Sequence, residues 1–273
     1  MTPTPPGLEE LKRYLQERHG FDLEHYSRSF LERRLLLRLR HHNVAGYEEY
    51  LSVLLKDRRE YLDLINTLSV NVTEFFRDAA LYQAVAERVL PKIKERNFRN
   101  GSRAVKAWSA GCASGQEAYT LAMLLDDYFG AQAPAWACEV HASDIQENFL
   151  AEARTGKYPK GKAAQIPASF RKRYVIEDGG HVSMAPRLKK LVNFFKHDLA
   201  SPPPLESLDL LFCRNVMIYF NGETKEKILR WFHRCLNPDG FLVLGACEII
   251  LKADLFQLAD SEHKIYHRAA HDA

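Results

Sequence analysis

The stretch from Val105 to Tyr119 constrains the fold of this chain more than any other. A short apolar run leads into small residues that include Gly111 and Gly115, and a helical pattern of apolar residues follows. This order predicts a β-strand, a tight turn and an α-helix. Glycine reaches positive φ without a Cβ clash, and the N–H groups that open the helix face the same space as the turn. The turn is therefore either a close-packed connection or the cradle of a ligand.

The next predicted strand favours the ligand. Residues 136–142 form an apolar run that is typical of a buried strand, and Asp144 follows at its end. In doubly wound sheets an acidic residue at this position accepts hydrogen bonds from ribose hydroxyls. Asp144 is also suited to cap the helix that begins near Gln146, and the two roles are compatible. Together the turn and the acid favour an adenosine-containing ligand at the carboxyl edge of a parallel sheet.

Composition excludes several classes of protein. The chain has 273 residues, of which 46% are hydrophobic and 27% charged, and this balance is typical of a soluble globular protein. A net charge of +3 is too small to indicate a nucleic-acid partner by itself. The five cysteines lack the spacing of zinc ligands, so we expect reduced thiols and no metal. Without a signal peptide or an apolar run of membrane length, we expect a cytoplasmic protein that does not insert into membranes.

Two patterns divide the chain into predicted domains. Helical periodicity fills the region from Gly7 to Val70, which predicts an all-α domain over residues 1–70. From Val105 strands alternate with helices, which predicts an α/β domain with a parallel sheet over residues 71–273. A basic region at about 157–190 interrupts this alternation and predicts a small inserted β subdomain. The expected strands of the main sheet are near 105–110, 136–142, 191–195, 208–213, 240–245 and 263–268.

The predicted helix from Arg28 to His42 is strongly basic. It holds five arginines against one acid, Glu32. On a helical wheel four leucines share one face, namely Leu31, Leu35, Leu36 and Leu39. The other face holds most of the basic residues together with Phe30 and Leu37, namely Arg33, Arg34, Arg38, Arg40 and His41. The basic face is either solvated or a docking surface for an acidic partner, with Phe30 and Leu37 as apolar anchors.

Two further segments place polar residues where a ligand is expected. Thr73 is predicted to cap a helix that Pro91 ends, whereas Asn71 and Arg77 are not needed for capping and suit a lid over a ligand. The predicted strand 208–213 ends at the pair Arg214–Asn215, at the edge where such sheets bind ligands. If Arg214 were only structural, it would need a carboxylate partner.

These motifs resemble the CheR-type chemotaxis receptor methyltransferases over nearly the whole chain. The motifs that carry the resemblance are NVTEFFRD at 71–78, SAGCASGQEAYTLAM at 109–123, ASDI at 142–145, FCRNVMIYF at 212–220 and LNPDGFLVLGACE at 236–248. The resemblance implies a Rossmann-like S-adenosylmethionine-binding domain, an N-terminal helical domain and a small inserted β subdomain. It also implies transfer of a methyl group to glutamate side chains of chemoreceptors, with S-adenosylhomocysteine as the second product.

The positions of two residues make them candidates to act on the acceptor. Tyr219 lies just past the predicted strand 208–213 and is our candidate for orienting the acceptor carboxylate. Arg88, one helix away, either neutralises this carboxylate or is an exposed helix residue. The implied partner is the cytoplasmic helical region of chemoreceptors, docked by the basic helix Arg28–His42 of a monomeric enzyme. The positions that the resemblance assigns to cofactor contacts are Asn71, Thr73, Arg77, Glu117, Asp144, Asp198, Leu199, Arg214 and Asn215.

Three alternatives stay open at this point. A methyltransferase acting on nucleic acid is disfavoured, because Arg214-Asn215-Val216-Met217 stands where a base-flipping enzyme has Asn-Pro-Pro-aromatic. A nicotinamide dehydrogenase is disfavoured because no full G-x-G-x-x-G follows the first strand. A non-catalytic protein that retains cofactor binding is the third, and intact polar residues at every motif argue against it.

Overall fold

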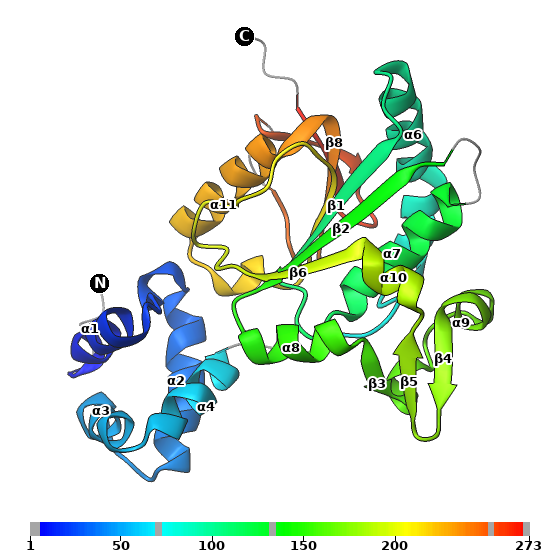
Figure 1. The fold of residues 1–273 in the computed structure, drawn as a ribbon. Helices are drawn as coiled ribbons and strands as arrows, with labels where there is room; N and C mark the ends of the chain where they lie inside the picture. The colour runs from blue at the N-terminus through cyan, green and yellow to red at the C-terminus, as the bar shows by residue number, and fades with distance from the viewer. Residues whose placement is uncertain (1–5, 69–72, 131–134, 251–253, 270–273) are drawn as a thin grey trace. The chain divides into compact units, whose positions relative to one another are not determined.

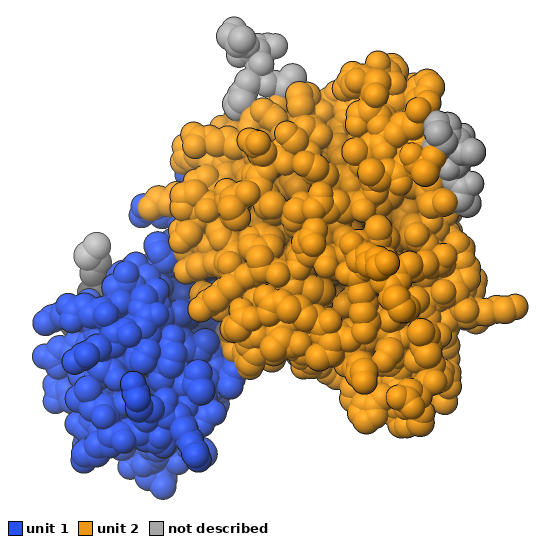
Figure 2. All heavy atoms as spheres, in the orientation of Figure 1, with its two compact units in different colours: residues 1–71, 219–226 blue, residues 72–218, 227–273 orange. Residues whose placement is uncertain are grey.

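The computed structural model describes residues 6–68, 73–130, 135–250 and 254–269. The chain divides into two compact units, coloured separately in Figure 2. Unit 1 comprises Met1–Asn71 together with Tyr219–Glu226, and unit 2 comprises Val72–Ile218 and Lys227–Ala273. Among the described residues no helix is long and apolar enough to cross a membrane.

Unit 1 is built on four helices with apolar inner faces. Their buried leucines, such as Leu15 of the first and Leu35 of the second, recur at helical spacing and face the inside of the unit. The first helix ends at Gly20, whose left-handed conformation lets its N–H cap the carbonyl of Gln16. The helices are α1 (Leu8–His19), α2 (Arg28–His41), α3 (Tyr47–Lys56) and α4 (Arg58–Leu68).

A buried carboxylate joins three of these helices. Glu60 of α4 is 2% exposed, and it accepts hydrogen bonds from Arg38 and His42 at the end of α2 and from Tyr50 of α3. Burial alone would raise the pKa of Glu60, but these donors lower it from 4.5 to about 2. Arg38 is thereby used inside the unit, so it does not belong to an exposed basic face.

The segment Tyr219–Glu226 returns to unit 1 from far along the sequence. The N–H of Ser27 donates to the carbonyl of Tyr219 at 2.8 Å, and Tyr26 forms a β-bridge with Phe220. Phe30 of α2 is only 3% exposed, because it packs here. The expectation that Phe30 is an exposed docking anchor is therefore wrong.

Unit 2 is a seven-stranded sheet flanked by helices (Figure 1). The strand order is β6-β2-β1-β7-β8-β10-β9; the first five strands are parallel, and β10 runs antiparallel to both of its neighbours. The predicted Rossmann-like sheet is confirmed. The bounds are β1 (Ala104–Ala110), β2 (Ala137–Asp144), β6 (Val192–Lys196), β7 (Leu208–Cys213), β8 (Leu236–Leu244), β9 (Phe256–Asp260) and β10 (Ile265–Arg268).

The order of this sheet reverses between β1 and β7. The chain leaves β1 towards β2 and β6 on one side, and then crosses to β7 and β8 on the other. In open parallel sheets the loops on either side of such a reversal separate, and ligands bind in the crevice outside the carboxyl ends of the strands. The helices that connect the strands are α7 (Gln116–Phe129), α8 (Glu147–Thr155), α10 (Pro186–Leu191) and α11 (Gly222–Cys235).

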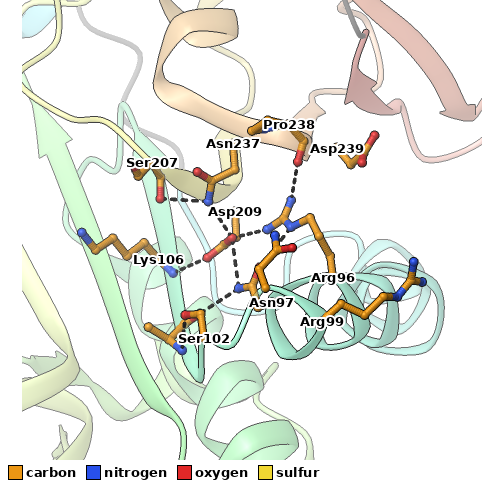
Figure 3. A pocket seen from close by; sticks show the side chains of 12 residues that line it. Arg96, Asn97, Arg99, Ser102, Lys106, Ser207, Asp209, Asn237, Pro238 and Asp239 are labelled. Atoms are coloured by element: carbon orange, nitrogen blue, oxygen red, sulfur yellow. Dashed lines mark hydrogen bonds and ion pairs between the residues drawn. The ribbon is translucent and has the colours of Figure 1, made fainter.

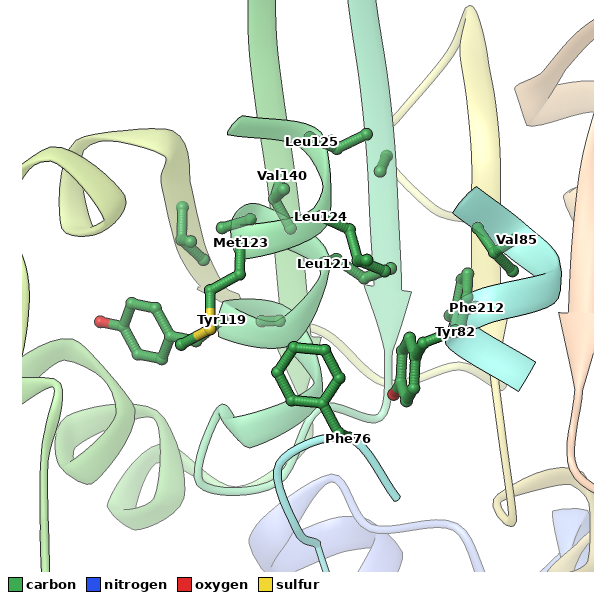
Figure 4. Close-up of a cluster of buried hydrophobic side chains, with 14 of the residues drawn as sticks. Phe76, Tyr82, Val85, Tyr119, Leu121, Met123, Leu124, Leu125, Val140 and Phe212 are labelled. Carbon is green, nitrogen blue, oxygen red and sulfur yellow. The ribbon is translucent and has the colours of Figure 1, made fainter. Parts of the chain in front are cut away.

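The core of unit 2 lies where α7 covers the sheet (Figure 4). Leu121 and Leu125 of α7 are buried over β1 and β2, which contribute Ala107 and Val140. On the other flank Tyr82 stacks on Phe212 of β7, with ring centroids 5.9 Å apart. This packing fixes the start of α7 and therefore the turn that precedes it.

The helix before the sheet differs from the prediction. It begins at Ala79 rather than after Thr73, and it does not end at Pro91: α5 (Ala79–Ala84) continues through a π-helical turn (Val85–Val89) into α6 (Leu90–Arg99). The π-helical turn offsets the hydrogen-bond ladder, so Pro91 occupies the first turn of α6, where its missing N–H leaves no gap.

A second, three-stranded sheet forms within the range 157–190. Its strands β3 (Lys157–Pro159), β4 (Val175–Asp178) and β5 (His181–Met184) are antiparallel in the order β3-β5-β4, with α9 (Ala168–Tyr174) beside them. The hydroxyl of Tyr158 donates to the carbonyl of Ser114 at 2.7 Å. The inserted subdomain is thus tied to the turn that follows β1.

Candidate functional site

The turn after β1 requires its glycines. Gly111 has a φ of 81° and Gly115 a φ of 90°. A Cβ on Gly111 would lie 2.6 Å from a methyl carbon of Val216, and one on Gly115 would lie 2.8 Å from the Cβ of Ala153. A side chain at either position would therefore displace a neighbouring segment as well as strain the backbone. Both glycines thus serve a close-packed connection, and the role of the turn as the cradle of a ligand stays a prediction.

Asp144 braces this turn from the end of β2. One carboxylate oxygen accepts the N–H of Ala113 at 2.9 Å, and the other accepts the N–H of Gln146 at 3.0 Å, just before α8. Burial raises the pKa of Asp144 despite these backbone donors. The carboxylate therefore organises the turns after both β1 and β2, and its proposed bond to a ribose hydroxyl stays a prediction.

Glu117, in the first turn of α7, lies beside Arg214 at the end of β7. Ser109 donates a hydrogen bond of 2.8 Å to one oxygen of Glu117, and Nη1 of Arg214 lies 3.7 Å from the other. Burial raises the pKa of Glu117, and the nearby guanidinium of Arg214 offsets only part of this shift. A partly desolvated carboxylate with remaining lone pairs is suited to accept a hydrogen bond from a ligand amine or hydroxyl.

Arg214 holds a second segment of the site. Its side chain is 3% exposed, and it pairs with Asp78 while donating to the carbonyl of Arg77 at 3.2 Å. Burial alone would lower the pKa of Arg214, but Glu117, Tyr82 and Asp78 raise it. The carboxylate partners that a structural arginine needs are therefore present, and they bring residues 77–78 to the carboxyl edge of the sheet.

Unusual backbone conformations gather at this edge. Phe76, Asp78, Ala113 and Asn215 all have positive φ, at 51°, 65°, 45° and 59°. Residues with a Cβ avoid this region unless the surrounding structure holds them there, and such strain tends to collect at functional sites. Three segments of the chain meet here in conformations that their own sequences do not favour.

Asp198 and Leu199 follow β6 at the same edge. The N–H of His197 donates to the carbonyl of Asp144 at 3.0 Å, which sets this loop beside the end of β2. The carboxylate of Asp198 accepts the N–H of Ala200 at 2.9 Å, and Leu199 is 8% exposed. The loops after β1, β2, β6 and β7 therefore bring six of the predicted site residues to one edge of unit 2, namely Glu117, Asp144, Asp198, Leu199, Arg214 and Asn215.

Other predicted residues lie elsewhere or outside the description. Asn71 is outside the described residues, and Thr73 is half-buried near the start of unit 2. Tyr219 belongs to unit 1. Arg88 lies on the π-helical turn, where its exposed guanidinium pairs with Asp260 of β9 at 2.8 Å. Arg88 is therefore paired with a strand that carries none of the site loops. The catalytic roles of Arg88 and Tyr219 stay predictions.

One site residue was missed. Glu248, just after β8, is 5% exposed and accepts hydrogen bonds from the backbone of the loop that carries Arg214 and Asn215. The sequence offers one signal, a single acid directly after the apolar run that forms the fifth parallel strand.

A cavity of about 470 Å³, lined mainly by polar and charged residues, lies at the amino ends of the parallel strands, away from the carboxyl edge (Figure 3). Its floor is Asp209 of β7, whose carboxylate accepts the N–H of Lys106 at 2.8 Å and the amide of Asn237 at 2.9 Å, and pairs with Arg96. The buried charge is met within the protein, so this network fastens α6 to the amino ends of β1 and β7 rather than forming a ligand site.

Comparison with known proteins identifies the family. Residues 71–265 match the SAM binding domain of the CheR methyltransferases, and residues 6–69 match their all-alpha domain. The chain belongs to the CheR methyltransferase family. It is an S-adenosylmethionine-dependent methyltransferase, and the predicted family, fold and cofactor are confirmed.

Several relatives share about a third of its residues. It is 31% identical to a chemotaxis protein methyltransferase of Borreliella burgdorferi, over 90% of this chain and 89% of that protein. It is 32% identical to a chemotaxis protein methyltransferase of Escherichia coli, over 88% of this chain and 83% of that one. It also matches an uncharacterized 104.1 kDa protein of Rhodobacter capsulatus at 32% identity, and there the match covers only 25% of the relative.

The residues at the sheet edge fit S-adenosylmethionine. Asp144 and Glu117 supply carboxylate oxygens beside the ends of the neighbouring strands β2 and β1. Such acceptors suit the ribose hydroxyls and amino groups of the cofactor, and the cation of Arg77 suits its carboxylate.

Proposed function

We propose that this methyltransferase esterifies glutamate side chains of chemotaxis receptors. The observation that carries this proposal is the match to chemotaxis protein methyltransferases over 88–90% of the chain, combined with an intact set of polar residues at the cofactor edge. The second line of support is the helical unit 1, which matches the all-alpha domain of the CheR methyltransferases and is not needed for cofactor chemistry.

An exposed strip on α2 is our candidate for the receptor-docking surface. Arg33, Leu36, Leu37, Arg40 and His41 are exposed, and their spacing places them on one face of the helix. We name these five residues the α2 strip. Its arginines suit an acidic helical surface, and Leu36 and Leu37, which are 44% and 47% exposed, add apolar contact area at its centre.

The chemistry of the acceptor makes small demands on the protein. A glutamate carboxylate has an unperturbed pKa near 4.3, so it is already an anion at neutral pH and needs no general base. Bound S-adenosylmethionine supplies a methyl group that is activated by its sulfonium. The residues of the chain bind and orient the reactants and exclude water, and positioning of this kind lowers a barrier by about 7–11 kcal/mol.

Two side chains are proposed to act on the acceptor. Tyr219 would orient the carboxylate through its hydroxyl; its backbone, fixed by Ser27, favours a defined position for the ring. Arg88 would offset the charge of the carboxylate, but to do so it must leave its ion pair with Asp260. Tyr219 is therefore the better supported of the two.

The test is methylation of receptor-containing membranes with S-adenosylmethionine labelled in its methyl group. Glutamate methyl esters hydrolyse in base, whereas methylated amines and nucleobases do not, so we expect base-labile label on the receptor. A matched receptor whose candidate glutamates are replaced by alanine is the control. Base-stable label, or equal label on both receptors, would contradict the proposal.

A further inference from the structure

The carboxylate of Glu248 is surrounded by backbone N–H groups. One oxygen accepts from Gly245 at 2.7 Å and from Asn215 at 2.9 Å. The other accepts from Val216 at 3.0 Å and from Ile218 at 3.3 Å. None of the ion pairs between described residues involves Glu248, so backbone dipoles alone meet its negative charge. Charge-assisted bonds of this kind are roughly twice as strong as neutral ones.

Three of these four donors belong to the loop that follows β7. We name residues 214–218 the β7 loop; it carries the cofactor-edge residues Arg214 and Asn215. Asn215 has a φ of 59°, a conformation that turns successive N–H groups of the loop towards one point. Glu248 occupies that point, so the loop conformation and the buried carboxylate depend on each other.

Gly245 provides the space for this contact. A Cβ at this position would lie 2.8 Å from an oxygen of Glu248 and 2.9 Å from the backbone nitrogen of Asn215. The end of β8 and the β7 loop are therefore too close for any side chain between them. Apolar packing does not require such an approach at a loop, but the hydrogen bonds to the carboxylate do.

We propose that Glu248 is a positioning residue for the cofactor site. It holds the β7 loop so that Arg214 reaches Glu117 and Asp78, and so that Asn215 faces the cofactor edge. Glu248 acts through these residues and does not contact the cofactor itself. The inference rests on the cofactor site at the carboxyl edge of the sheet, and it is independent of the identity of the methyl acceptor.

The test replaces Glu248 by glutamine, which has the same shape but only one acceptor oxygen. The amide N–H₂ then faces two backbone donors, so half of the cluster is lost. We expect Glu248→Gln to weaken S-adenosylhomocysteine binding at least 10-fold in calorimetry. Hydrogen exchange in the β7 loop should accelerate, while exchange in the strands of the sheet stays slow.

Asp209→Asn is the matched control. Asp209 is also a buried carboxylate that accepts a backbone N–H, but it lies at the opposite edge of the same sheet. This variant should lower the melting temperature of the protein and leave affinity for S-adenosylhomocysteine within about 2-fold of wild type. A merely structural role of Glu248 would give both variants the same effect on affinity.

Two further variants keep the test decisive if Glu248→Gln folds poorly. Glu248→Asp retains the charge and should recover part of the affinity, whereas Gly245→Ala leaves Glu248 in place but forces the β7 loop away and should weaken binding. Wild-type affinity in Glu248→Gln or in Gly245→Ala would overturn the inference. No receptor is used, so a failure of receptor methylation does not affect this result, and a wild-type protein that binds no S-adenosylhomocysteine would instead overturn the cofactor site.

Discussion

The ring of Tyr219 packs on the ring of Phe30 in α2, with 4.8 Å between the ring centroids. The residue predicted to orient the methyl acceptor is therefore held by the helix that carries the α2 strip. Because Phe30 fixes the ring, the phenol has little freedom to turn. Removing only its hydroxyl should leave this packing intact.

We expect Tyr219→Phe to lower kcat for receptor methylation more than it changes cofactor affinity. A hydroxyl that orients the acceptor contributes mainly in the transition state, so its loss appears in kcat. Single-turnover transfer with saturating receptor and cofactor, measured from about pH 6 to pH 8.5, is the experiment. Both proteins should give nearly flat profiles, because the acceptor carboxylate is ionised throughout this range. A rate that rises near pH 7, and that loses this rise when one histidine is replaced, would contradict the mechanism.

Charge reversal in the α2 strip should weaken receptor docking. Arg33→Glu with Arg40→Glu should raise the apparent KM for receptor and leave S-adenosylhomocysteine affinity unchanged. Wild-type activity should also fall as salt rises past about 0.15 M, where screening acts within roughly 8 Å. The control is Arg13→Glu with Arg18→Glu, an equal charge change on exposed positions of α1. Equal KM values for the two double variants at low salt would mean that the α2 strip is a solvated surface and does not dock the receptor.

Loss of the carboxylate at the end of β2 should weaken cofactor binding. Asp144→Ala removes the acceptor of two backbone N–H groups along with the proposed ribose contact, and we expect a loss of roughly 1–3 kcal/mol in binding free energy. Isothermal calorimetry with S-adenosylmethionine and S-adenosylhomocysteine measures it. Glu139→Gln, near the other end of the same strand, should bind both ligands as the wild type does. Unchanged affinity in Asp144→Ala would remove Asp144 from the binding site.

The buried carboxylate of unit 1 should make its stability depend on pH. The pKa of Glu60 is about 2 in the folded protein and 4.5 in a free side chain, so the unfolded chain binds the proton more tightly. The stabilisation is therefore complete above about pH 4.5 and is lost as the pH falls through 2. The shift corresponds to about 3 kcal/mol.

Glu60→Gln should remove this dependence and destabilise the protein at pH 7, because the partly buried Arg38 then keeps only the more distant carboxylate of Asp63, at 3.8 Å. Urea unfolding followed by helical circular dichroism at pH 7 and pH 3.5 measures both effects. The exposed Glu48→Gln on α3 is the control. If Glu60→Gln and wild type lose equal stability between the two pH values, the ion cluster does not stabilise unit 1.

Much of this fold could be predicted because its signals are local. Apolar runs that end at glycines or polar residues marked β1, β2, β6, β7 and β8, and parallel pairing then brought Asp144 and Arg214 to one edge. β9 was missed because Phe256–Asp260 alternates only weakly and is fixed by pairing with β10. The prediction that a helix ends at Pro91 was wrong because the π-helical turn before this residue has no clear sequence signal.

Interactions between distant residues could not be predicted in the same way. Nothing near Arg38 in the sequence shows that it pairs with Glu60, and nothing near Glu248 shows that its partners are the amides of the β7 loop. Leu36 was placed on the buried face of α2, but it is 44% exposed because the neighbouring helices cover only part of that face. Such contacts follow from the tertiary fold, which local periodicity does not describe.

The return of Tyr219–Glu226 to unit 1 limits how the helical unit can be exchanged between relatives by recombination. A helical module that ended at one linker could be transplanted between relatives by a single recombination event. Here Phe30 of α2 packs on Tyr219, and the N–H of Ser27, just before α2, donates to the carbonyl of Tyr219. The helix therefore depends on a segment that lies far downstream in the sequence, between two stretches of unit 2. A chimera that takes only the first 71 residues would join α2 to a foreign partner for Phe30. Under the proposed docking role of the α2 strip, receptor specificity is inherited as two separated pieces of sequence that must change together.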